Sequence, residues 1–149
     1  MQFETTTCIA KEHRELLNYY ASVFDISVTD FITSLIHYAV LCKKQDPKTF
    51  KGIQYRKRRK GQWERIHLYV RYNEYEFLLD MKKIWKMSVA LLIEYCIENV
   101  LEEFVKRLSE EDDTYSYRFR SYTIKFEKIY GFESFQIIWG LPPEIMEKT

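Results

Sequence analysis

The sequence contains few residues that interrupt regular structure, with four glycines and three prolines among 149 residues. Its three cysteines are an odd number, and none lie at the close spacing of a metal-binding pair. No apolar run reaches the ~20 residues that a membrane-spanning helix needs. The first ten residues have neither the basic nor the apolar segment of a secretory signal. We therefore expect a compact, helix-rich, cytoplasmic chain with no membrane association.

Groups typical of catalytic sites are also scarce. The three histidines, His13, His37 and His67, are far apart in the sequence, and there is no glycine-rich phosphate loop. The carboxylates lie mainly on the expected outer faces of helices, where exposure to solvent is their ordinary explanation. We therefore expect no enzymatic activity, no bound metal and no cofactor.

A strand followed by two helices is predicted between Trp63 and Phe104. Residues 65–70 alternate between polar and apolar side chains, which is the period of a half-buried strand. After residue 73 the period becomes helical, and Ser88 is a candidate N-cap for a second helix. The expected apolar stripe of the first helix is Phe77, Leu78, Met81, Ile84 and Trp85. That of the second helix is Val89, Leu92, Ile93, Cys96, Ile97, Val100, Leu101 and Phe104.

The same pattern occurs near the start of the chain. Residues 3–41 align with residues 64–102 at a shift of 61 positions without a gap, and Ser27 aligns with Ser88. Any two amphipathic helical hairpins align in some register, but here one register matches a strand, two helices and a cap, which favours a duplication. A strand is expected over residues 3–9, with helices over 11–25 and from 28 to about 43. The first of these helices is expected to bury Leu16, Leu17, Tyr20, Val23 and Phe24.

This repeated pattern resembles the ribbon-helix-helix superfamily of DNA-binding repressors, over residues 3–41 and 64–104. The resemblance implies an α+β chain whose two units, 1–44 and 63–109, pair their strands into one antiparallel ribbon. A basic linker, 45–62, would join the units, and a small antiparallel β section would follow over residues 110–149. Family members often have glycine between the two helices, where a left-handed residue is wanted. This chain has Asp25 and Lys86 there.

The net charge of +1 conceals a very uneven distribution. Residues 42–62 contain nine basic side chains and one acidic side chain, a net charge of +8, whereas residues 1–41 carry −3. Such asymmetry indicates a polyanionic partner. An extra strand is expected over residues 51–57, with a turn into the next strand near Gly61. We interpret the basic run as a contact to DNA phosphates, the alternative being a solvated loop; the run is Arg56, Lys57, Arg58, Arg59 and Lys60.

In the family that this chain resembles, the ribbon enters the DNA major groove, where alternate side chains face the base edges. The outward residues of the second strand would be Arg65, His67 and Tyr69, and those of the first Glu4 and Thr6. Arg65 can donate two hydrogen bonds to guanine, and Glu4 can accept one from cytosine. For His67 the alternative is an ordinary packed or solvent-facing histidine. The first strand suits DNA less well, so we expect a non-palindromic half-site, or a homodimer with two good strands on adjacent sites.

Ser27 and Ser88 are interpreted first as helix N-caps. The N-terminus of a helix also attracts a phosphate through its amides and its dipole, so both serines are candidate phosphate contacts. The two interpretations are compatible.

The section after the acidic run 109–114 is rich in aromatic residues. Alternation at Tyr122, Ile124 and Phe126, a turn at Gly131 and a further alternating segment predict a small antiparallel sheet. Such a sheet would pack on the helices or serve as a surface for homo-oligomerisation.

The sequence therefore predicts sequence-specific binding of double-stranded DNA, as in a transcriptional regulator, by a single-chain pseudo-dimer. The alternative is a degenerate duplicate that no longer binds DNA and serves as a protein-interaction or antitoxin-like scaffold. The acidic first unit and Glu4 favour this alternative, whereas the linker of charge +8 favours DNA.

Overall fold

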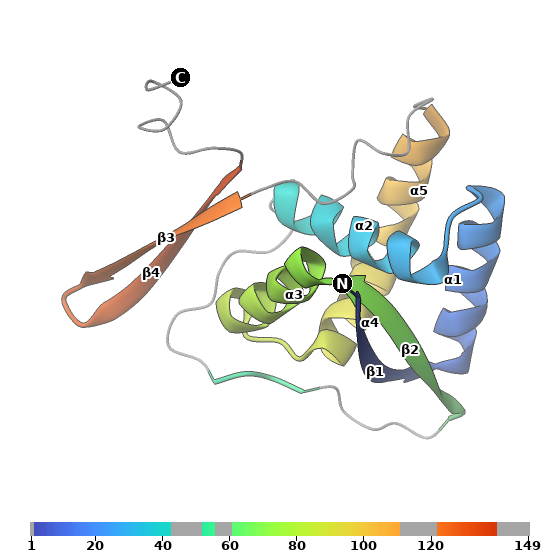
Figure 1. Cartoon of the computed structure of the whole chain (residues 1–149), viewed down its shortest axis with the longest axis horizontal. Coiled ribbons are helices and arrows are strands. Elements are labelled where there is room, and N and C mark those ends of the chain that lie inside the picture. The colour runs from blue at the N-terminus through green and yellow to red at the C-terminus, as the bar shows by residue number, and fades with distance from the viewer. Residues whose placement is uncertain (1, 43–51, 56–60, 111–121, 140–149) are drawn as a thin grey trace.

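The computed structural model describes residues 2–42, 52–55, 61–110 and 122–139, and these form an α+β structure with five helices and two antiparallel sheets (Figure 1). The first half contains β1 (Gln2–Ala10), α1 (Lys11–Val23) and α2 (Val28–Leu41). The second contains β2 (Trp63–Arg71), α3 (Tyr72–Trp85), α4 (Val89–Asn99) and α5 (Leu101–Glu110). The last two strands are β3 (Tyr122–Ile129) and β4 (Phe132–Trp139).

β1 and β2, the two expected strands, pair with each other in antiparallel orientation. The register runs from Gln2 opposite Arg71 to Ala10 opposite Trp63. Thr6 lies opposite His67, and these two residues are also equivalent under the shift of 61 positions. Thr6 and His67 therefore mark the local two-fold axis of the ribbon.

The strands and the helices that follow them begin 61 positions apart in the two halves. Each strand leads directly into a helix, and the second helices begin at Val28 and Val89, which are also 61 positions apart. The residues between the helices, Asp25 and Lys86, have φ angles of 54° and 57°. The left-handed conformation expected at both positions is thus present, although neither residue is glycine.

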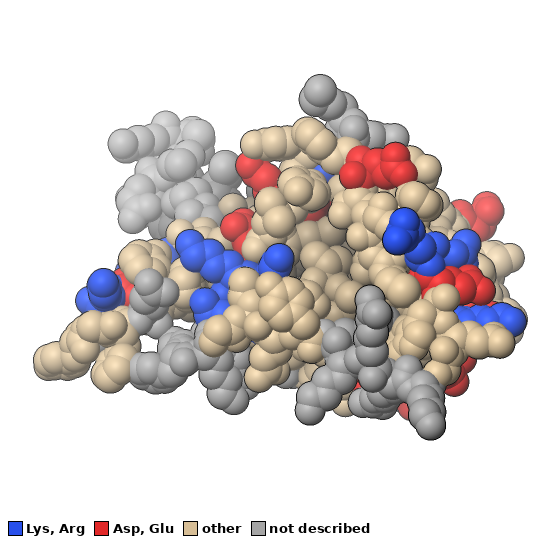
Figure 2. All heavy atoms as spheres, turned by 90° about the horizontal axis from the view of Figure 1, so that it is seen from below, with Lys and Arg blue, Asp and Glu red and all other residues tan. Residues whose placement is uncertain are grey.

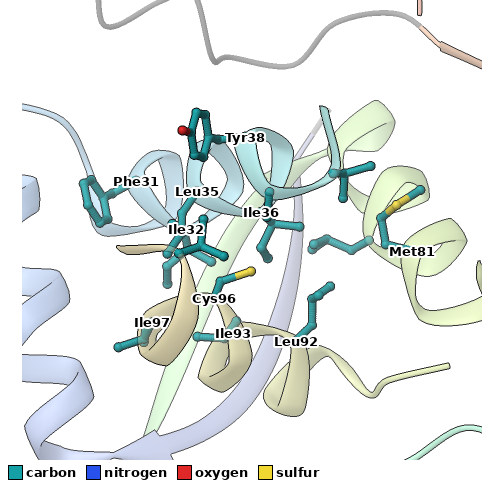
Figure 3. Close-up of a cluster of buried hydrophobic side chains, with 14 of the residues drawn as sticks. Phe31, Ile32, Leu35, Ile36, Tyr38, Met81, Leu92, Ile93, Cys96 and Ile97 are labelled. Atoms are coloured by element: carbon teal, nitrogen blue, oxygen red, sulfur yellow. The ribbon is translucent and has the colours of Figure 1, made fainter. Parts of the chain in front are cut away.

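The core lies where α2 crosses α4. Figure 3 shows side chains from these two helices meeting between them, with Met81 of α3 to one side. α2 is buried on all its faces from Phe31 to Val40, because strands, helices and aromatic side chains surround it. The apolar stripe expected for α3 is buried as predicted; its members are Phe77, Leu78, Met81, Ile84 and Trp85.

Two expectations about the helical halves were wrong. Leu16 and Val23 are 41% and 56% exposed, since only one narrow side of α1 faces the core. The second helix expected after Ser88, with its apolar stripe from Val89 to Phe104, is divided at Val100, where φ is −126°. Of the strand expected over residues 51–57, the described residues form one bridge, between Gln54 and Met87, and the remainder lies outside the described residues.

The C-terminal strands form a hairpin with a two-residue turn. Ile129 pairs with Phe132, and the turn residues Tyr130 and Gly131 both have positive φ, 52° and 82°. This combination is that of a type I′ turn, whose twist suits a hairpin. The turn expected at Gly131 is therefore confirmed, while residues 111–121 of the expected β section lie outside the described part of the chain.

Among the described residues, no single helix combines the length and apolar character needed to cross a bilayer. α1 and α2 meet that requirement only as a pair, and they are bent by 98° with respect to each other.

Replacing Lys86 by glycine should stabilise the protein. A left-handed conformation costs a residue with a Cβ about 1–2 kcal/mol, and glycine offsets part of this gain by its greater freedom in the unfolded chain. We expect Lys86→Gly to raise the free energy of unfolding by roughly 0.5–1 kcal/mol in urea titrations. Asp25→Gly, the matched variant in the first half, should gain less because aspartate tolerates this conformation better. A lower urea midpoint for Lys86→Gly would contradict the strain argument.

Candidate nucleic-acid interface

The ribbon of β1 and β2 has one buried face and one exposed face. Ile66, Leu68 and Val70 are buried against the helices, and this burial fixes which side of β2 faces outward. The outward side chains of β2 are Arg65, His67 and Tyr69, and those of β1 include Glu4 and Thr6, all exposed. The structure thus brings the five residues predicted to contact bases onto one surface.

His67 occupies the centre of this surface and contacts two side chains of β1. Its Nδ1 atom lies 2.6 Å from Oε1 of Glu4 and 3.4 Å from Oγ1 of Thr6. Glu4 is a diagonal neighbour, since Tyr69 is the residue directly opposite it in the register. Because a carboxylate accepts hydrogen bonds, the short contact favours a proton on Nδ1, and Nε2 is then the ring nitrogen left for a further partner.

α1 supports the ribbon near Arg65. Arg14 donates from Nη1 to the main-chain oxygen of Arg65 at 3.2 Å, and its Nε lies 3.2 Å from Oε2 of Glu64. These contacts place the Arg14 guanidinium beside Arg65, one of the outward residues of β2. Sequence reasoning did not select Arg14, because the contact depends on how α1 folds back on β2.

Arg71 is a further outward residue that sequence reasoning missed. It is exposed, it continues the alternation of Arg65, His67 and Tyr69, and it pairs with Gln2. Its main-chain N–H donates to Oε1 of Glu74 at 3.1 Å, which joins the end of the strand to the start of α3. The expected strand ended at residue 70, one residue too early, although the two-residue period already reached Arg71.

Ser27 and Ser88 are N-caps, as predicted. Ser27 Oγ accepts from the Asp30 N–H at 3.0 Å, and Ser88 Oγ accepts from the Leu91 N–H at 3.2 Å. The two helix ends nevertheless have different surroundings.

The first turn of α2 accepts a hydrogen bond from the ribbon, and the N-cap of α4 donates one to residues 52–55. The Tyr69 N–H donates to Oγ1 of Thr29 at 3.4 Å, so the start of α2 lies beside the outer edge of β2. At α4, the Ser88 N–H donates to the main-chain oxygen of Gln54 at 2.8 Å. The main-chain N–H of Ser88 therefore already has a partner in the described chain.

The predicted phosphate contacts Arg56, Lys57, Arg58, Arg59 and Lys60 lie outside the described residues. The segments on either side of them are held to the body by main-chain hydrogen bonds. Gln54 N–H donates to the Lys86 oxygen at 2.7 Å, and the Gln62 oxygen accepts from the Lys11 N–H at 2.9 Å. The second of these bonds lies at the end of the ribbon where β2 begins.

Charges of both signs occur on the described surface near the ribbon. Figure 2, seen from below the view of Figure 1, shows Lys and Arg side chains interspersed with Asp and Glu on this face. The +8 segment, residues 42–62, thus remains the main concentration of one sign in the sequence.

Strong pKa shifts occur away from the ribbon. Burial raises the pKa of the Cys96 thiol in the core, which keeps this thiol protonated and unreactive. Burial, together with the hydrogen bond to Asp80, raises the pKa of Tyr122 at the junction of the hairpin with α3. Within the described parts of the chain, no cluster of three or more His, Cys, Asp or Glu residues is arranged to hold a metal ion.

Comparison with known proteins gave no match to a family model, to a curated protein or to a solved structure.

Proposed function

We propose that this chain is a sequence-specific DNA-binding protein of the ribbon-helix-helix type, in which one molecule supplies both strands of the ribbon. The observation that carries the proposal is the antiparallel pairing of β1 with β2 around Thr6 and His67. A two-stranded ribbon of this kind fits the major groove, and its outward side chains then reach the base edges. The family that the repeated pattern resembles consists of repressors, so the proposed role is in transcriptional regulation.

The two strands would read different bases. Under the shift of 61 positions Glu4 is equivalent to Arg65, and Cys8 is equivalent to Tyr69. An arginine donates to guanine, whereas a glutamate accepts from cytosine. The two halves of the binding site would therefore differ in sequence even though the backbone of the ribbon is locally two-fold symmetric.

Arg65→Ala should weaken binding to the cognate duplex by about 1–3 kcal/mol and relax the preference for one base pair. The physical reason is the loss of two hydrogen bonds to guanine. The cognate site would first be selected from a random duplex library, and fluorescence anisotropy would then measure the affinity of each variant.

Lys106→Ala is the matched control, because Lys106 is an exposed cation on α5, outside the ribbon. The control should retain both affinity and sequence preference. If Arg65→Ala behaves in the same way as Lys106→Ala, Arg65 does not read a base.

A scaffold that binds a protein rather than DNA is the second candidate, and the contact between Glu4 and His67 favours it. This contact places a carboxylate near the centre of the ribbon, where it would face the negative potential of DNA. Absence of binding to any duplex at low salt would select this candidate.

A further inference from the structure

One face of the hairpin of β3 and β4 contacts α3. The Tyr122 hydroxyl donates to Oδ2 of Asp80 at 2.5 Å, and the Tyr122 ring lies edge-on to Phe77 with centroids 5.5 Å apart. Nearer the turn, Lys83 Nζ lies 5.8 Å from the centroid of Phe135. These contacts hold the hairpin to the body, and Figure 1 shows its turn pointing away from the helices.

Beyond these contacts the same face remains uncovered. Phe126 is 51% exposed and packs on Phe135 with centroids 5.3 Å apart. A hollow of about 310 Å³ separates this part of the hairpin from α3; its lining includes Asp80, Ile84, Ile124 and Phe126. Phe126 therefore offers apolar surface that a partner could cover.

The outer edge of β3 is open within the described part of the chain, because β4 is its only described neighbour. The Ile129–Phe132 pair closes a two-residue turn and is therefore a hydrogen-bonded pair. Hydrogen-bonded and non-hydrogen-bonded pairs alternate along the hairpin, so Phe126 belongs to a non-hydrogen-bonded pair with Phe135. It follows that the N–H and C=O groups of Phe126 point to the open edge.

The charges beside Phe126 make this edge complementary to itself. Lys125 and Glu127 flank Phe126 on the opposite face of the hairpin, and both are about half exposed. If two copies of β3 pair in antiparallel orientation with Phe126 at the centre, Lys125 of each copy lies opposite the partner's Glu127. Opposite charges in directly facing positions stabilise a strand pair, and the facing side chains are close because this pair is not hydrogen-bonded.

We propose that a second copy of this chain binds at the open edge of β3, so that two hairpins form a four-stranded antiparallel sheet across a two-fold axis at Phe126. Each Phe126 then exchanges two main-chain hydrogen bonds with its counterpart, and the two rings lie side by side on the apolar face. A single strand edge is a small interface, so the dimer is expected to be weak and dependent on concentration. The proposal does not rest on DNA binding.

The choice of a second copy follows from the charge order along β3. An unrelated strand would need a matching sequence of its own, whereas Lys125 and Glu127 match their own two-fold images. β4 offers no comparable pattern, since its only charged residue is Glu133. Lys125 and Glu127 also contact each other within one chain, at 3.1 Å, so a test must separate the intramolecular pair from the intermolecular one.

Charge-reversal variants provide that separation. Lys125→Glu leaves two glutamates on the edge, and Glu127→Lys leaves two lysines, so each variant repels its own copies. Sedimentation equilibrium should show the wild type dimerising as concentration rises, and each variant should dimerise roughly tenfold more weakly. An equimolar mixture of the two variants should recover the dimer as a heterodimer, identified by native mass spectrometry.

Recovery on mixing is the decisive observation, because loss of the intramolecular contact would affect both variants without making them associate. Circular dichroism would establish that both variants are folded. The proposal would be overturned if the wild type stays monomeric at every concentration. It would also be overturned if the mixture associates no better than the separate variants. Either result would hold against a second copy of this chain even if β3 binds a different protein. Binding of a duplex with a single site is measured separately, so failure of dimerisation and failure of DNA binding are distinguishable.

Discussion

Leu17→Ala should lower the free energy of unfolding by about 2–5 kcal/mol, while Leu16→Ala should lower it by less than about 1 kcal/mol. Leu17 is completely buried, and its removal leaves a cavity in addition to the lost transfer energy. Leu16 is 41% exposed, so its truncation leaves space that water can fill. Urea unfolding followed by circular dichroism measures both values, and each midpoint should shift without a change in the slope.

The two variants form their own control, because they remove the same atoms from adjacent positions of α1. Helix propensity favours alanine equally at both positions. Equal losses of stability at Leu16 and Leu17 would mean that α1 turns a different side to the core.

Leu16 and Leu17 also show how well helical periodicity predicts which residues are buried. The spacing of apolar residues correctly located α1 and its general inward side. It assigned Leu16 and Val23 to the core as well, because a stripe read from sequence is wider than the strip that neighbouring elements cover. α3 has more of its stripe covered, and there the five expected residues are all buried.

The division between α4 and α5 shows a second limit. No glycine or proline occurs near Val100, and apolar spacing continues through it. The hydrogen bonds from Val100 N–H to the Cys96 oxygen and from Phe104 N–H to the Val100 oxygen are both formed, at 2.9 Å. A local change of direction that preserves these bonds leaves no sequence signal of the kind that glycine and proline provide.

For the candidate site, the outward residues other than Arg71 could be predicted from the sequence, but their mutual contacts could not. Alternation alone gives the face of each strand, so Arg65, His67 and Tyr69 could be predicted. The contact between Glu4 and His67 depends on the register of the two strands. A shift of the register by one residue would abolish this contact. The role of Arg14 depends on tertiary packing and had no sequence signal.

Replacing the basic run, Arg56 to Lys60, by glutamine should have the largest effect on DNA binding. Each phosphate contact contributes about −0.9 to the slope of log K against log salt, so five contacts contribute about −4.5. We therefore expect the variant to bind duplex DNA at least about a hundredfold more weakly at low salt, and to depend less steeply on salt. Anisotropy titrations at several salt concentrations measure both quantities.

The main-chain hydrogen bonds of Gln54 and Gln62 explain why this run should matter more than other cations. They hold the two flanks of the run to the body, and the bond from Lys11 to Gln62 lies at the end of the ribbon. The chain on both sides of the run is therefore anchored to the body that carries the ribbon. Lys106→Gln with Lys128→Gln is the control, since both lysines are exposed and neither belongs to the ribbon. A salt slope that is the same for the wild type and the linker variant would remove the run from the interface.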